Sequence, residues 1–262
     1  MPDFLPSHPL QEPPPPLPRW KCVVAYDGTD FNGWQSQRGG QTIQDLIETS
    51  LAHCLDRPQR IVGAGRTDSG VHARGQVFHF PGLWPHGTDT LLRALNSRLP
   101  SSIRILSVAE ASPDFSARFS ALGKRYVYRI HRHFAPPFET RYYHSHGGRP
   151  FQTELLQEAA KQFLGTHDFT GFAVSSTQEE NPVKTITRSV VFYHGERIHY
   201  LVEGSGFLYK QVRSMAGALL QVARGKLLPA EIGEILASCQ RTTEVATAPA
   251  QGLSLERVFY PR

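Results

Sequence analysis

Residues 20–28, Trp-Lys-Cys-Val-Val-Ala-Tyr-Asp-Gly, form an apolar run that ends in the turn dipeptide Asp27-Gly28. This pattern is typical of a β-strand, so we expect a strand over residues 20–26. The next periodic segment begins at Thr42, where Asp45 stands at the spacing of a helix cap and apolar residues then recur every three or four positions to Leu55. The chain is therefore expected to open with a strand followed by a helix.

The order of the later elements predicts two similar halves. The first half continues with strands at 60–62 and 76–80, a helix at 88–99 and a strand at 103–109, which gives the order β-α-β-β-α-β. The second half is expected to repeat this order, with a strand at 124–131, a helix at 153–164, strands at 185–194 and 197–203, helices at 208–223 and 229–237, and a strand at 255–260.

Two split-βαβ units predict an α+β fold in which two ferredoxin-like halves join mainly antiparallel sheets around a central cleft. No sequence identity relates the halves, so this prediction depends on element order alone. We divide the chain into a disordered, proline-rich tail at 1–18, an N-terminal half at 19–121 and a C-terminal half at 122–262.

Composition excludes several classes of protein. The 262 residues are 40% apolar, which suits a folded chain, and no run approaches the roughly 20 apolar residues of a spanning helix. The N-terminus lacks the apolar segment of a signal peptide, so we expect a cytoplasmic protein. Cys22, Cys54 and Cys239 form no CxxC pair and suggest neither a disulfide framework nor a cysteine-built metal site.

A net charge of +5 permits a polyanionic partner, and the placement of the basic residues favours such a partner more than the net charge alone does. Basic and aromatic side chains are interleaved at Lys124, Arg125, Tyr126, Tyr128, Arg129, Arg132, Phe207, Tyr209, Lys210 and Arg213. This pattern fits a groove that holds phosphates and stacks bases, and equally a solvated strand face with core tyrosines.

Residues 63–73, Gly-Ala-Gly-Arg-Thr-Asp-Ser-Gly-Val-His-Ala, carry the strongest chemical signal. Three glycines permit tight turns and close approach of a ligand, and they place Asp68 in a loop that faces a cleft. A phosphate cradle is excluded, because the spacing is not GxxxxGK[ST] and a carboxylate would repel phosphate. The alternative is a structural turn in which Asp68 caps the backbone.

The histidines do not predict a metal site. His72, His131, His133, His144 and His146 lack a third ligand at a familiar distance, so we expect no metal site. No cofactor is expected either. Ser69 has no GxSxG context and is not expected to be a nucleophile.

The loop Gly65-Arg-Thr-Asp-x-Gly-Val-His-Ala73 resembles the active-site signature of the tRNA pseudouridine synthase A family. The resemblance extends through 26–44, 115–128, 206–217 and 248–253 and so covers residues 20–260. The departures are mild: the proline-rich tail is extra, Ser69 replaces a more usual alanine, and Lys184 stands where the family often has arginine.

The resemblance implies roles for individual residues. It makes Asp68 the nucleophile or base, Arg213 the ion-pair partner that keeps this carboxylate ionised, and Tyr126 the ring that stacks on the target uracil. Five further basic residues are expected to contact RNA: Arg66, Lys124, Arg125, Lys184 and Lys210. An aspartate can attack the sugar C1′ or the base C6, or deprotonate the sugar to give a glycal, and the sequence does not choose among these routes.

The resemblance further implies uridines 38 to 40 of the tRNA anticodon stem and loop as substrates, and a homodimer as the working form. Three alternatives are a synthase for another RNA site, a catalytically idle RNA-binding protein and a small-molecule hydrolase. Retention of Asp68, Tyr126 and Arg213 together disfavours the idle binder, and the absence of a second obvious catalytic carboxylate disfavours the hydrolase.

Overall fold

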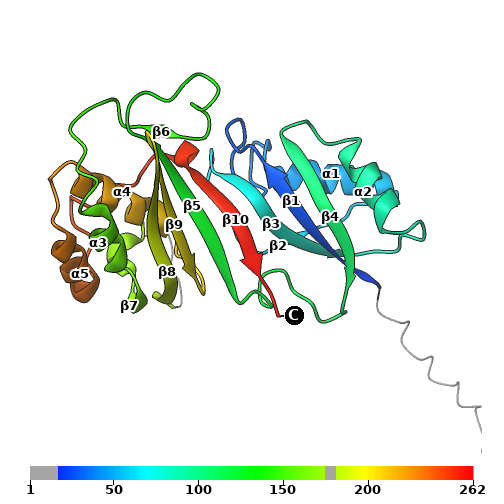
Figure 1. Cartoon of the computed structure of the whole chain (residues 1–262). Helices are drawn as coiled ribbons and strands as arrows, with labels where there is room; N and C mark the ends of the chain where they lie inside the picture. The colour runs from blue at the N-terminus through cyan, green and yellow to red at the C-terminus, as the bar shows by residue number, and fades with distance from the viewer. Residues whose placement is uncertain (1–16, 175–180, 262) are drawn as a thin grey trace, which may run out of the picture.

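A single ten-stranded sheet forms the centre of the molecule in the computed structural model, which describes residues 17–174 and 181–261 (Figure 1). The predicted tail at 1–18 therefore lies outside the described residues except for its last two. The strands are β1 (Arg19–Tyr26), β2 (Val62–Gly63), β3 (His72–Pro81), β4 (Ile103–Ala111), β5 (Gly123–His131), β6 (His144–Ser145), β7 (Gly165–Asp168), β8 (Val183–His194), β9 (Arg197–Gly204) and β10 (Leu253–Phe259). Eight of them run in the order β4-β1-β3-β10-β5-β9-β8-β7, with β2 on β3 and β6 on β5.

The last strand, β10, joins the two halves into one sheet. It pairs in parallel with β3 of the first half and antiparallel with β5 of the second. All other neighbours on the main path are antiparallel. The predicted α+β class with joined, mainly antiparallel halves is confirmed, whereas the division between residues 121 and 122 stays a prediction.

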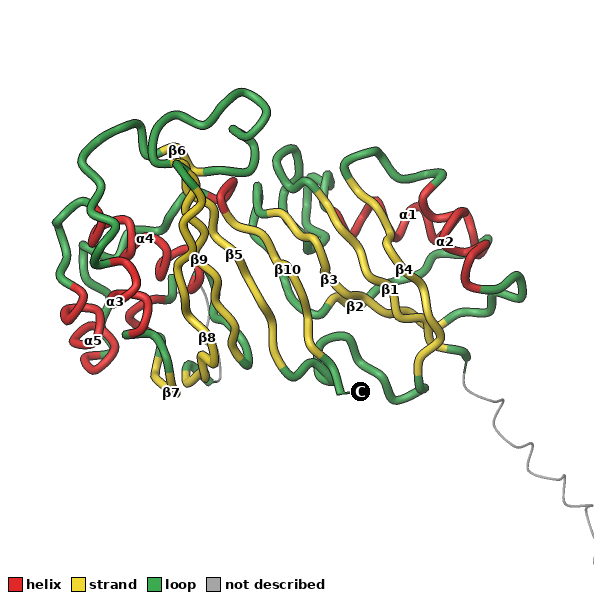
Figure 2. The backbone as a smooth tube through the Cα atoms, viewed as in Figure 1, coloured by secondary structure: helices red, strands yellow, loops and turns green. Residues whose placement is uncertain are grey.

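The helices gather at the two ends of the sheet (Figure 2). Those of the first half pack together beside β4, and those of the second half pack beside β5, β7 and β8. They are α1 (Ile43–Leu55), α2 (Thr88–Asn96), α3 (Leu156–Lys161), α4 (Gln211–Ala223) and α5 (Pro229–Ser238), with the short 3-10 turns η1 (Thr170–Phe172) and η2 (Ala250–Gly252). None of the helices in the described ranges is long and apolar enough to cross a membrane.

The first helix begins where the sequence predicts it. The side chain of Thr42 accepts a hydrogen bond from the Asp45 backbone N–H at 3.2 Å, which satisfies one of the free donors of the first turn. Ile43, Ile47 and Leu51 then bury one face of α1 in the core. The structure therefore confirms both the predicted cap at Thr42 and the predicted helix after it.

The predicted helix at 208–223 begins later than expected, at Gln211. Lys210 is the N-cap in the left-handed region with φ +58°, and the Gln211 side chain accepts a hydrogen bond from the Leu208 N–H at 2.8 Å. Residues 208–210 therefore form a turn, so Lys210 precedes the helix that carries Arg213. Other differences are smaller: the expected helix at 153–164 is only α3, the strand at 60–62 shrinks to β2, and β6 and β7 were not predicted.

Candidate active site

The loop that carries Asp68 is fixed to the first half of the chain on the side of Thr67. The Thr67 carbonyl accepts a hydrogen bond from the Trp34 N–H at 3.0 Å, and the Thr67 hydroxyl is 2.8 Å from the Tyr26 hydroxyl. Gly33 has φ +83°, and a Cβ there would lie 2.7 Å from the Thr67 carbonyl oxygen. The backbone of the loop is thus held closely by Tyr26 at the end of β1 and by Gly33 and Trp34 in the segment that follows β1.

On its other side the loop closes as a turn against the second half. The Val71 N–H donates to the Asp68 carbonyl at 3.1 Å, and Gly70 adopts φ +75°. A Cβ on Gly70 would lie 3.2 Å from the Ala250 methyl group in η2. This contact brings the loop to the segment that precedes β10.

The Asp68 carboxylate forms an ion pair with Arg213 of α4, with 2.8 Å between Oδ2 and a terminal guanidinium nitrogen. The Arg213 Nε donates to the Ala248 carbonyl at 2.8 Å, and the Ala248 N–H donates back to the Arg213 carbonyl at 3.0 Å. The side chains of Asp68 and Arg213 are 20% and 15% exposed, so the pair is sheltered but open to a ligand. A guanidinium held at two points fixes the direction of the carboxylate.

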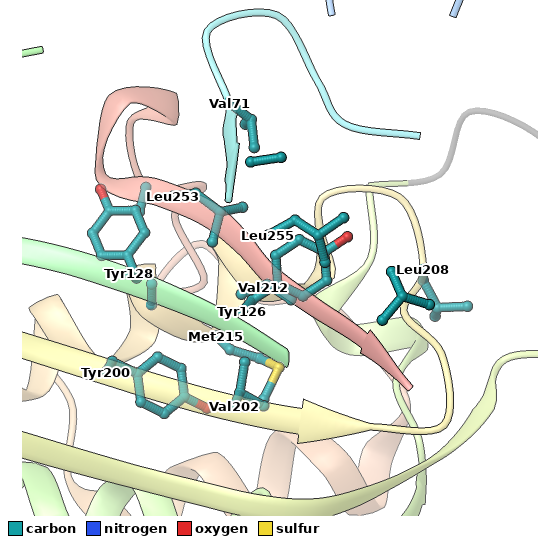
Figure 3. Close-up of a cluster of buried hydrophobic side chains, with 14 of the residues drawn as sticks. Val71, Tyr126, Tyr128, Tyr200, Val202, Leu208, Val212, Met215, Leu253 and Leu255 are labelled. Atoms are coloured by element: carbon teal, nitrogen blue, oxygen red, sulfur yellow. The ribbon is translucent and has the colours of Figure 1, made fainter. Parts of the chain in front are cut away.

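Tyr126 of β5 completes the centre. Burial raises the pKa of its phenol, and the nearby Tyr26 phenol and Asp68 carboxylate raise it further, so the group is neutral at physiological pH. Its ring meets Phe207 edge-on at 5.2 Å between centroids and lies near Val212 and Leu255 (Figure 3). The arrangement joins one anionic, one cationic and one neutral aromatic group, which suits covalent or base chemistry on a stacked ring.

The predicted RNA-binding residues fall in different places. Arg66 lies exposed on the Asp68 loop, and Lys124 shares a strand face with Tyr126. Lys210, the N-cap of α4, has its Nζ over the Tyr209 ring, 4.8 Å from the ring centroid. Lys184 lies near Lys124 at the start of β8. Arg125 points to the opposite face of β5, where it pairs with Glu203 at 2.7 Å.

A family model described as tRNA pseudouridine synthase matches residues 22–120 and 159–261, which include the Asp68 loop, α4 and β10, whereas β5 lies between the two matched segments. The chain belongs to this family. Similar proteins named tRNA pseudouridine synthase A occur in Bacillus pumilus, with 42% identity over 92% of this chain and 98% of the relative, and in Exiguobacterium sibiricum, with 39% identity over 93% and 97%. A third, from Akkermansia muciniphila, is 41% identical over 94% of this chain and 96% of the relative. The protein is therefore a pseudouridine synthase, an isomerase that modifies tRNA.

His72 of this synthase is a structural residue. Its Nδ1 accepts a hydrogen bond from the Gly28 N–H at 3.0 Å, which leaves Nε2 as the protonated nitrogen, 2.9 Å from the Arg141 carbonyl. Burial lowers the pKa of the imidazole, so the ring is neutral. Its hydrogen bond with the Gly28 N–H connects the end of the Asp68 loop to residues 27–28. In the described ranges, no group of three or more His, Cys, Asp or Glu side chains is placed to hold a metal ion.

Sequence reasoning missed several supports of the synthase site. Tyr26 and Thr67 anchor the loop, the Ala248 carbonyl anchors Arg213, and Gly252 admits the Tyr128 ring, since a Cβ there would lie 2.7 Å from the ring. Each stands inside a segment that the family resemblance covers. The family resemblance therefore marked these segments as important, but only the packing in the structure shows which residue each of them supports.

Proposed function

We propose that this synthase converts uridines at positions 38 to 40 of the tRNA anticodon stem and loop to pseudouridine, with Asp68 as the nucleophile. The observation that carries the proposal is the Asp68–Arg213 ion pair, which joins the two halves at 2.8 Å beside Tyr126. The names of the relatives support tRNA as the substrate. The choice of positions comes from the resemblance of the loop and its flanking motifs.

The reaction breaks the N1–C1′ bond of uridine, turns the uracil and forms a C5–C1′ bond, with loss of the proton from C5 and return of a proton to N1. It is an isomerisation, so atoms balance without an added cofactor. Asp68 is the group that attacks, either at C1′ or at C6, and Arg213 holds its carboxylate in the attacking direction. Because the raised pKa keeps Tyr126 neutral, we assign this ring the task of stacking on the uracil.

The target uridine must leave its stacked position before Asp68 can reach it. Arg66 is suited to hold the opened RNA, because its exposed side chain starts two residues before Asp68. Lys210 and Lys184 extend the basic surface from the same site, whereas Arg125, already paired with Glu203, lies on the other face of the sheet. We therefore place the RNA on the face that carries Asp68 and Tyr126.

We also propose that the synthase works as a homodimer in the cytoplasm. A tRNA extends well beyond its anticodon stem, so one subunit can hold the reacting stem while its partner contacts the body of the same molecule. The symmetry of such a dimer would give each tRNA one active site and one supporting surface.

The positions are tested with four unmodified transcripts of one tRNA. Three keep a uridine at only one of positions 38, 39 and 40, with base-paired partners changed to match, and the fourth has none. We expect pseudouridine in each of the first three, mapped by nucleoside-specific chemical cleavage, and none in the fourth. Product at another position of the fourth transcript would favour a synthase for a different RNA site. Binding without product in any transcript would favour an idle binder.

A further inference from the structure

Lys124 lies directly against the loop that carries Asp68. A Cβ added to Gly65 would be 2.7 Å from the Lys124 Nζ, so the ammonium group rests on the loop backbone three residues before Asp68. The Gln76 side-chain amide donates to the Gly65 carbonyl at 2.9 Å and holds the loop at this point. Lys124 and Tyr126 are two residues apart on one face of β5, about 7 Å along the strand.

The charges around Lys124 are cations. Its pKa is lowered to about 8, mainly by burial and further by Arg118 and Lys184. In residues 17–174 and 181–261, no carboxylate forms an ion pair with Lys124. Arg118 is exposed and lies over the Phe119 ring, and the Lys184 Nζ donates to the Asn181 carbonyl at 2.7 Å. A sheltered ammonium group between two cations is unfavourable until an anion arrives.

We infer that Lys124, with Arg118 and Lys184, binds the backbone phosphate that flanks the target uridine. This phosphate site rests on the proposed function, since it supposes that Asp68 reacts with the same nucleotide. In a nucleotide the phosphate is separated from the base by the ribose, and Lys124 is separated from the stacking ring of Tyr126 by a comparable step along β5. The ribose would then lie between them, opposite the Asp68 loop.

The reaction gives this site a specific task. Once the N1–C1′ bond has broken, the uracil no longer ties the ribose to Tyr126, and contacts with the flanking phosphates help to hold the sugar in place. A half-buried cation beside the Asp68 loop would keep C1′ in position while the uracil turns. Arg66 holds the RNA from a more exposed place and could not fix the sugar in this way.

The inference is tested by replacing Lys124 with methionine, which removes the charge and keeps the length of the side chain. Lys161→Met, at the exposed end of α3, removes the same charge far from the site and serves as the control. Each protein is titrated with tRNA that carries one neutral methylphosphonate linkage, placed in turn at the phosphates around the uridine that the wild type converts. The thermal midpoint of each variant is measured alongside.

We expect K124M to weaken tRNA binding about tenfold or more, the scale of a lost hydrogen bond between charged groups. For one linkage next to the converted uridine, the neutral group should weaken binding to the wild type and K161M by a similar factor, and to K124M hardly at all. If the effects of K124M and of the neutral linkage on the dissociation constant multiply at every linkage, the inference is overturned. It is also overturned if K124M leaves the affinity unchanged and lowers the thermal midpoint, because Lys124 is then a structural residue. Because the linkages are scanned around the mapped uridine, a target outside positions 38 to 40 refutes the proposed function without deciding this test.

Discussion

Replacing Asp68 with asparagine is expected to lower the rate of pseudouridine formation by at least about a thousandfold, the scale of losing a reacting group. The amide has nearly the same shape, and its oxygen can still accept the hydrogen bond from Arg213, which the carboxylate now accepts at 2.8 Å. The fold and the position of residue 68 should therefore survive, while the negative charge that attacks the uridine is lost. Single-turnover formation of pseudouridine with enzyme in excess measures this effect.

Two companion measurements separate chemistry from binding. The dissociation constant of the D68N variant for unmodified tRNA should equal that of the wild type or be lower, because the change removes a negative charge from a surface that faces phosphates. Asp89→Asn, which removes an exposed carboxylate in the first turn of α2, should leave the rate unchanged. A D68N rate within tenfold of the wild type would remove Asp68 from the proposed role.

Replacing Gly217 with alanine is expected to destabilise the protein by about 3 kcal/mol or more, at the upper end of the usual cost of overpacking. A Cβ at residue 217 of α4 would lie only 1.8 Å from the Ala246 carbonyl oxygen and 3.4 Å from the Ala248 nitrogen. The segment at 246–248 would have to move away from α4. Because the Ala248 carbonyl holds Arg213, the same shift would disturb the partner of Asp68.

Thermal unfolding followed by circular dichroism checks this prediction, and a midpoint roughly 10 °C lower is expected for a chain of this size. Gly233→Ala on α5 is the matched control, since its Cβ would meet only the end of the Gln162 side chain, at 3.2 Å. The higher helix propensity of alanine should leave the control unchanged or slightly more stable. A G217A midpoint equal to that of the control would contradict the prediction, because it would mean that residues 246–248 move away from α4 at little cost in stability.

Local patterns were sufficient to predict most of the elements. The cap at Thr42 and the spacing after it placed α1, and the alternation along β5 placed Tyr126 and Tyr128 on one buried face. The start of α4 was predicted too early because residues 208–210 carry apolar and basic side chains that fit a helix. Only the left-handed backbone of Lys210 separates these residues from the helix. The two-residue strand β6 is too short to leave a periodic signal.

Long-range geometry could not be read in the same way. Asp68 and Arg213 are 145 residues apart, and no local pattern brings them together; the family resemblance alone predicted their contact. The insertion of β10 between β3 and β5 likewise depends on how the whole sheet assembles. Arg125 and Lys124 look alike in the sequence, yet one pairs with Glu203 and the other faces the Asp68 loop, because neighbours on a strand point to opposite faces.

The most direct test of the central claim, that Asp68 reacts with an anticodon-arm uridine, is a structure of the D68N variant bound to unmodified tRNA. The account predicts one uridine from positions 38 to 40 turned out of its stack, with its ring on Tyr126 and its ribose in contact with residue 68. A complex in which the tRNA is bound but the uridine nearest to Tyr126 comes from elsewhere, or in which residue 68 touches no ribose or uracil, would contradict it.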